Sequence, residues 1–111
     1  MTSLSTHVLD LTHGRPAAGI AVTLLRDGVV LTQAVTDADG RCPGIGAAAD
    51  APGRYALRFA VADYFRGCGV GLPDPPFLDV VTIDFGMADV GGHYHVPLLV
   101  SPFGYSTYRG S

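Results

Sequence analysis

The chain has 111 residues, of which 48% are hydrophobic and 15% charged, a balance typical of one globular domain covering residues 1–111. It has neither the low hydrophobicity of a disordered chain nor the apolar run of about 20 residues that a membrane helix needs. Seven basic against ten acidic residues give a net charge of -3 without a basic stripe, so neither nucleic acid nor a membrane is expected as a partner.

Glycine and proline are frequent, with 15 and 8 residues, which favours many turns and short strands, and therefore an all-β fold. The two cysteines, Cys42 and Cys68, are too few for the disulfide framework of a small secreted scaffold. The first residues show no basic segment followed by an apolar one, as a secretory signal would. We therefore expect reduced thiols and a cytoplasmic location.

The first third of the chain predicts three strands, at residues 6–11, 20–26 and 29–36. The first strand ends at a turn over 13–16, which contains Gly and Pro. The second and third flank Asp27-Gly28, a pair that favours a type I′ hairpin turn because both central residues need positive φ.

The middle of the chain begins with a predicted turn at 36–41 and a long loop at 43–52, which is rich in Gly and Ala and offers little to pack. Residues 54–59 alternate between apolar and charged side chains and predict a half-buried strand. From Ala60 to Phe65 the apolar period becomes helical, and Gly67 and Gly69 end the short helix.

The last third opens with a rigid connector at 73–76 and then predicts three strands, beginning near residue 81, at 93–100 and at 105–109. The total is about seven strands and one short helix. On the strand at 93–100, His93 and His95 leave the same face as Pro97 and Leu99, while the other face is apolar.

Histidine is the side chain that titrates near neutral pH and also binds metals. His7 lies in the first strand, so three imidazoles could converge with His93 and His95. A histidine on a strand is more often a surface or structural residue, and Arg41 after the Asp39-Gly40 turn is by default a solvated cation. These residues alone leave the function open, and no Walker loop, nucleophile elbow or dinucleotide fingerprint is present.

Three segments resemble the transthyretin-related 5-hydroxyisourate hydrolases. They are Ser5–Asp10 with Gly14–Ala17 near the start, Thr36–Arg41 in the middle, and His93–Ser111 at the end. The final Tyr108-Arg109-Gly110-Ser111 is the most specific part. The chain departs from the family at Phe103, where tyrosine is more usual, and in its Ala- and Gly-rich loop at 42–52.

The resemblance implies an active site made of His7, Arg41, His95 and Ser111, with Tyr108 added to the residues that bind substrate. It implies hydrolysis of 5-hydroxyisourate to 2-oxo-4-hydroxy-4-carboxy-5-ureidoimidazoline in urate breakdown toward allantoin. His7 and His95 would activate water, Arg41 would bind the oxygens of the substrate, and Ser111 would offer its hydroxyl or terminal carboxylate. No cofactor and no metal are expected.

The resemblance also implies a transthyretin-like, or prealbumin-like, two-sheet β-sandwich of seven to eight strands with one short α-helix. Such chains assemble as a homotetramer, a dimer of dimers, with the sites in a central channel. Two alternatives stay open: a non-catalytic carrier of a small ligand, and a zinc hydrolase with histidine ligands. In the second, His93 would be a metal ligand.

Overall fold

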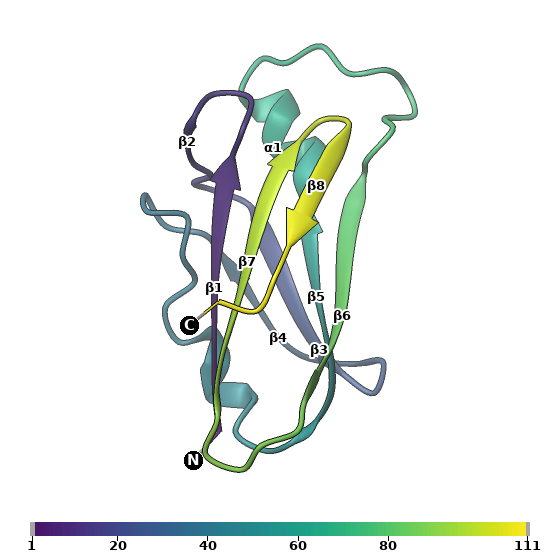
Figure 1. Ribbon diagram of the computed structural model, residues 1–111. Helices are drawn as coiled ribbons and strands as arrows, with labels where there is room; N and C mark the ends of the chain where they lie inside the picture. Colours follow the sequence, from purple (N-terminus) through teal and green to yellow (C-terminus); the bar gives the residue numbers. More distant parts are fainter. Residues whose placement is uncertain (1, 111) are drawn as a thin grey trace.

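The computed structural model describes residues 2–110 and consists of two packed sheets with a helix at one end (Figure 1). The elements are β1 (Ser3–Asp10), β2 (Arg15–Pro16), β3 (Ala21–Arg26), β4 (Val29–Val35), the 3-10 helix η1 (Ile45–Ala48), β5 (Gly53–Ala60), α1 (Val61–Gly67), β6 (Val80–Met87), β7 (His93–Ser101) and β8 (Gly104–Thr107). The two four-stranded sheets have the orders β2-β1-β7-β8 and β4-β3-β5-β6. The predicted β-sandwich with one short helix is confirmed.

The core lies between the sheets and follows from the alternation of apolar side chains along each strand. In β1, even-numbered residues such as Leu4 and Val8 are buried and odd-numbered ones are half-buried. The predicted inward face of β5, with Tyr55, Leu57 and Phe59, is fully confirmed. Each such side chain contributes about 1.5–3 kcal/mol by its burial. Because the core uses only the inward face of each sheet, the outward face of the β2-β1-β7-β8 sheet is left open.

The hairpin between β3 and β4 has the turn that the sequence predicts. Asp27 and Gly28 have φ of 48° and 79°, the left-handed values that a type I′ turn requires at both central positions. Asp27 is the one residue other than glycine with positive φ in the described chain. The hairpin fixes the register of β3 against β4 from its closed end.

The predicted helix is present but begins and ends slightly later than expected, at Val61 and Gly67. Val61, Tyr64 and Phe65 are buried, as the helical period indicated. Gly69 has φ of 81°, and the following N–H, of Val70, donates to the carbonyl of Phe65 at 3.0 Å, which closes the end of the helix. Among residues 2–110, no helix has the length and apolar character needed to cross a membrane.

Two predictions about strand positions need correction. The first strand covers Ser3–Asp10 rather than 6–11, because pairing with β7 begins at Ser3, while Leu11 lies beyond the sheet and is 55% exposed. The predicted turn at 13–16 contains a two-residue strand, β2, in which Pro16 and Arg15 pair with the last residues of β1. Pro is acceptable there because β2 is an edge strand. Residues 2–110 therefore contain eight strands.

The expectation that the loop at 43–52 has little to pack is wrong. Its η1 turn buries Ile45, and Ala49 is also fully buried. A Cβ on Gly46 would come 2.1 Å from the carbonyl oxygen of Leu4, so a glycine is needed for this close approach. Small residues in this loop thus serve packing against β1.

Replacement of Gly40 tests how much the turn at 36–41 contributes to stability. Its φ is 75°, and an added Cβ would lie 2.4 Å from the carbonyl oxygen of Val8. We expect Gly40→Ala to lower the free energy of unfolding by about 3 kcal/mol or more, because backbone strain and a backbone clash add. Gly28→Ala is the matched control, with φ of 79° and no atom within 4 Å, and should cost roughly 1–2 kcal/mol. If urea unfolding showed that the two variants lose the same free energy of unfolding, this account would be contradicted.

Candidate active site

The open face of the β1-β7 pair carries the histidines that the sequence singled out. The two strands run parallel, with Ser3 opposite His93, Ser5 opposite His95 and His7 opposite Pro97. His7 and His95 are therefore diagonal neighbours on one face, a spacing that side chains of this length can bridge. Both are half-buried, whereas His93 is exposed. Parallel pairing of distant segments thus brings the two imidazoles together.

Arg41 reaches the same place from the turn at 36–41. It forms an isolated antiparallel bridge with His7, and the N–H of Val8 donates to the carbonyl of Gly40 at 2.8 Å. The carboxylate of Asp37 accepts from the N–H of Arg41 at 3.0 Å and so closes the turn. The structure therefore brings together three of the predicted site residues, His7, Arg41 and His95.

His95 has the electrostatic surroundings of a neutral imidazole. Burial lowers its pKa below the ordinary value of 6.5, and repulsion from Arg41, and from His7 and His93 in their protonated forms, lowers the pKa further. Near neutral pH the ring is then uncharged and can accept a proton. The guanidinium of Arg41 beside it supplies a fixed positive charge for an anionic substrate oxygen.

Two serines connect the histidines in an unbroken chain of hydrogen bonds. Ser3 Oγ lies 2.6 Å from His93 Nδ1, and Ser5 Oγ lies 3.3 Å from His93 Nε2. Ser5 Oγ also lies 2.8 Å from His95 Nδ1. Because Nδ1 of His95 is engaged by Ser5, its Nε2 is the ring nitrogen left to face a ligand. Both ring nitrogens of His93 are engaged by serines.

Sequence reasoning missed the part played by Ser3 and Ser5. Their alternation with buried residues in β1 was a usable signal, because it places both on the face of His7. Their contact with His93 and His95 also requires that β1 and β7 pair in parallel, with Ser5 opposite His95. A pairing between segments about 90 residues apart cannot be read from local patterns.

The C-terminal segment passes back across β7 toward β1 after β8 (Figure 1). The N–H of Gly110 donates to the carbonyl of His95 at 2.7 Å, and a Cβ on Gly110 would come 2.5 Å from Cδ2 of the imidazole. Arg109 donates to the carbonyl of His93 at 3.2 Å and lies 4.0 Å from the centre of the Tyr94 ring. Ser111 itself lies outside the described residues.

Tyr108 is not gathered with the imidazoles in this chain. It is exposed and lines a groove of about 220 Å³, together with residues of β6 that include Ile83 and Phe85, and with Tyr94 of β7. This groove lies toward the inward-facing side chains of β7, away from the open face of His95. A contact of Tyr108 with substrate therefore stays a prediction.

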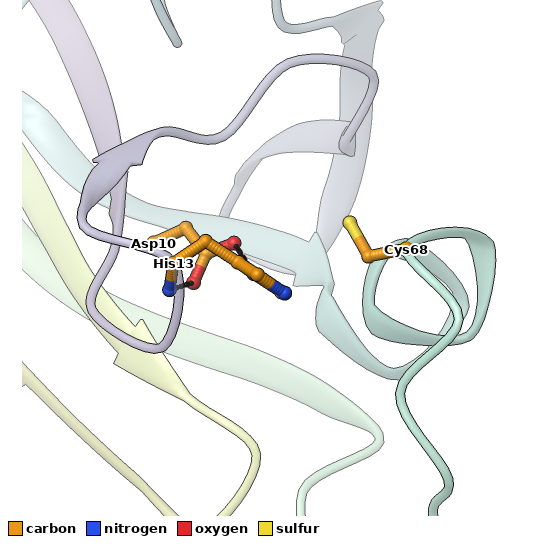
Figure 2. Close-up of side chains that lie close together, drawn as sticks. All are labelled: Asp10, His13 and Cys68. Atoms are coloured by element: carbon orange, nitrogen blue, oxygen red, sulfur yellow. Dashed lines mark hydrogen bonds and ion pairs between the residues drawn. The ribbon is translucent and has the colours of Figure 1, made fainter.

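A second cluster of chemistry-bearing side chains lies beyond the end of β1 (Figure 2). Within residues 2–110, three possible metal-binding atoms come within 4.8 Å of one another at one place, on Asp10, His13 and Cys68. The guanidinium of Arg15 donates to the sulfur of Cys68 at 4.0 Å. A cation beside the sulfur opposes the binding of a metal ion there.

Hydrogen bonds within the protein already occupy the carboxylate of Asp10. One oxygen accepts from the N–H groups of Thr12 and His13 at 2.9 and 3.0 Å. The other accepts from Tyr64 Oη at 2.7 Å and pairs with His13 Nδ1 at 2.6 Å. Burial alone would raise the pKa of Asp10, but the bonds from Tyr64 and His13 outweigh it, and the pKa is lowered. The cluster therefore ties the β1-β2 turn to α1 and serves the fold.

The chain is similar to proteins of a known family. Residues 4–110 match the model of the HIUase/transthyretin family. The chain is 55% identical over 117 residues to a 5-hydroxyisourate hydrolase of Ralstonia nicotianae, with 100% of both chains covered.

Two solved structures are similar over nearly their whole length. A Klebsiella pneumoniae 5-hydroxyisourate hydrolase has a TM-score of 0.85 and 40% identity, with 98% of this chain and 99% of that chain covered. Sea bream transthyretin in complex with thyroxine has a TM-score of 0.84 and 29% identity, with coverages of 96% and 93%. The transthyretin-like form of the sandwich, expected from the sequence, is confirmed.

The electrostatics of the site predict how His95 titrates. We expect its pKa, measured by NMR on labelled imidazole, to lie below 6.5, and to rise in Arg41→Gln, because removing a neighbouring cation stabilises the imidazolium. Arg58→Gln, which removes an exposed arginine from β5 of the other sheet, is the matched control and should leave the pKa unchanged. An unaltered His95 titration in Arg41→Gln would contradict the assigned surroundings.

Proposed function

Because the chain belongs to the HIUase/transthyretin family, we propose that it is an enzyme that hydrolyses 5-hydroxyisourate. The product would be 2-oxo-4-hydroxy-4-carboxy-5-ureidoimidazoline, on the route of urate breakdown toward allantoin, and we place the reaction in the cytoplasm. The observation that carries the proposal is the gathering of His7, Arg41 and a His95 of lowered pKa on one open face. The 55% identical relative bears the name of this activity.

In the proposed mechanism, water attacks a carbonyl carbon of the six-membered ring. His95, neutral at working pH, accepts a proton from the water as the new carbon–oxygen bond forms. Arg41 offsets the negative charge that develops on the carbonyl oxygen. When the ring carbon–nitrogen bond breaks, the leaving nitrogen takes a proton from one of the two imidazoles. His7, beside Arg41, orients the water, and Ser111 completes the site.

We propose that the chain assembles as a homotetramer, a dimer of dimers, around a channel that holds the sites. A single sandwich buries one face of each sheet, and here the polar face of β1 and β7 is left open. The residues that β1 contributes to it are half-buried rather than fully solvated, and β8 at the edge of this sheet is exposed along its whole length. A second copy facing this surface would enclose the substrate at His7, Arg41 and His95. Ser3 and His93, at the start of β1 and β7, would stay in contact with bulk water.

A non-catalytic carrier is the second candidate, favoured by the similarity to sea bream transthyretin in complex with thyroxine. A channel that only binds an apolar ligand needs no imidazole held neutral beside a guanidinium. The polar set of His7, Arg41 and His95 therefore favours catalysis.

A zinc hydrolase is the other alternative, with His93 as its discriminating residue. Both ring nitrogens of His93 are within hydrogen-bond distance of serine hydroxyls, at 2.6 Å from Ser3 and 3.3 Å from Ser5. A ligand would need one of these nitrogens free and aimed at the metal together with His95. The geometry therefore favours His93 as a neighbour of the site.

Replacement of His95 tests the catalytic assignment. We expect His95→Asn to lower kcat on freshly generated 5-hydroxyisourate by about 10²–10⁴-fold, the usual range for loss of a general base. His13→Asn, in the cluster beyond β1, is the matched control and should keep kcat near that of the wild type. Near wild-type turnover by His95→Asn would refute the assignment, and activity lost with a chelator and restored by zinc would support the zinc hydrolase instead.

Removal of Tyr108 to Ser111 tests whether the C-terminal segment positions the site. The deletion removes the bond from Gly110 to His95 and the contacts of Arg109 with His93 and Tyr94. We expect a folded tetramer by light scattering, with activity reduced on the order of 10²-fold or more, because a displacement of about 1 Å has that effect. A truncated protein that turned over substrate normally would contradict this prediction.

A further inference from the structure

We propose that Ser5, His93 and Ser3 form a proton relay that carries a proton away from His95 after it acts as a base and returns one when it acts as an acid. This inference rests on the proposed function, since it assigns positioning and relay roles around the same imidazole. It goes beyond the expected site, which contains neither serine and leaves His93 without a role.

The relay is defined by three consecutive hydrogen bonds on the open face. They join His95 Nδ1 to Ser5 Oγ at 2.8 Å, Ser5 Oγ to His93 Nε2 at 3.3 Å, and His93 Nδ1 to Ser3 Oγ at 2.6 Å. Each atom is contributed by β1 or β7, so the parallel register sets the spacing. The chain leads from the half-buried His95 to the exposed His93.

The chemistry of a hydroxyl couples the two histidines. Ser5 has one proton to donate, so in a continuous chain it accepts from one imidazole and donates to the other. If His95 carries its proton on Nδ1, then Ser5 donates to His93 Nε2 and His93 carries its proton on Nδ1 as well. If the chain runs the other way, both rings carry their protons on Nε2. The two neutral histidines therefore share one tautomer.

The proton count closes over a catalytic cycle. In the first half, water gives a proton to His95 Nε2 and its oxygen bonds to the ring carbonyl carbon. The Nδ1 proton of His95 then passes to Ser5, the proton of Ser5 to His93 Nε2, the Nδ1 proton of His93 to Ser3, and the proton of Ser3 to bulk water. His95 is left neutral with a proton on Nε2.

In the second half, His95 gives the Nε2 proton to the leaving nitrogen as the carbon–nitrogen bond breaks. The relay runs in reverse, takes one proton from bulk water at Ser3 and returns one to His95 Nδ1. Over the cycle, the oxygen of one water molecule is bonded to the former carbonyl carbon together with one of its protons. The other proton reaches the leaving nitrogen through His95 Nε2, while the relay gives one proton to solvent and takes one back.

The charges that face His95 explain why export of the proton is favourable. Arg41 and His7 face it from the turn at 36–41 and from β1, and His93 faces it from its own strand. A second positive charge held on His95 beside the guanidinium of Arg41 would be costly. Passing the proton to the exposed end of the chain leaves the site with the single fixed charge of Arg41.

The first test reads the tautomers directly and does not depend on turnover. Nitrogen NMR of labelled histidines, at a pH where both are neutral, should find His93 and His95 in the same tautomer. Ser5→Ala should uncouple them and alter both spectra, Ser5→Thr should restore the wild-type pattern, and Ser106→Ala on β8 of the same sheet should change neither. Opposite tautomers in the wild type would overturn the relay.

The second test measures proton transfer. Ser5→Ala should lower kcat by about 10–100-fold, part of the usual acid–base contribution, with KM changed less than about twofold, and added imidazole buffer should restore much of the loss. Ser5→Thr should keep most of the activity. A Ser5→Ala enzyme with wild-type kcat, or a deficit that buffer does not relieve, would overturn the relay. If His93 and His95 of the wild type have the same tautomer but the protein does not hydrolyse 5-hydroxyisourate, the proposed function is wrong, while the hydrogen-bond coupling of the two histidines is still supported.

Discussion

The parallel pairing of β1 with β7 is the constraint on which the site depends. It aligns Ser3 to Asp10 with His93 to Val100 without a shift in register. The period of two in both strands then separates a largely apolar inward face from an outward face that carries the histidines. A slip of one residue between the two strands would turn one of them over and bring either His7 or His95 into the core in place of an apolar side chain. The free energy that holds the core together therefore also fixes the geometry of the imidazoles.

Two segments that are not long strands complete the site by closing on this pair. The turn at 36–41 is bonded through Gly40 to Val8 and sets Arg41 beside His7. The C-terminal segment is bonded through Gly110 to His95. At both places a glycine allows the backbone to approach more closely than a side chain would permit. Backbone contacts thus position Arg41 and His95, and leave the guanidinium and the Nε2 of the imidazole to face a ligand.

The sequence predicted the features that depend on residues close together in the chain, and it missed those that depend on contacts between distant segments. Alternation identified the inward faces of β5 and β7, and Asp27-Gly28 predicted its turn, because these features depend on neighbouring residues. The packed turn of η1 and the short strand β2 were not predicted, since each depends on contacts with β1. His7, Arg41 and His95 became site residues through resemblance, because no local pattern shows that three distant segments meet.

The role of Ser5 shows what the fold adds to a set of matched residues. A family that includes both hydrolases and transthyretin uses one sandwich, so the scaffold does not by itself determine catalysis. What distinguishes a catalytic face is the control of protonation, and here burial and Arg41 keep His95 neutral while Ser5 holds its Nδ1. An imidazole in that state can accept a proton, but holding the added positive charge beside Arg41 is costly until the leaving nitrogen needs it. The exposed His93, bonded to the same hydroxyl, offers that charge a path away from Arg41 between the two halves of the hydrolysis.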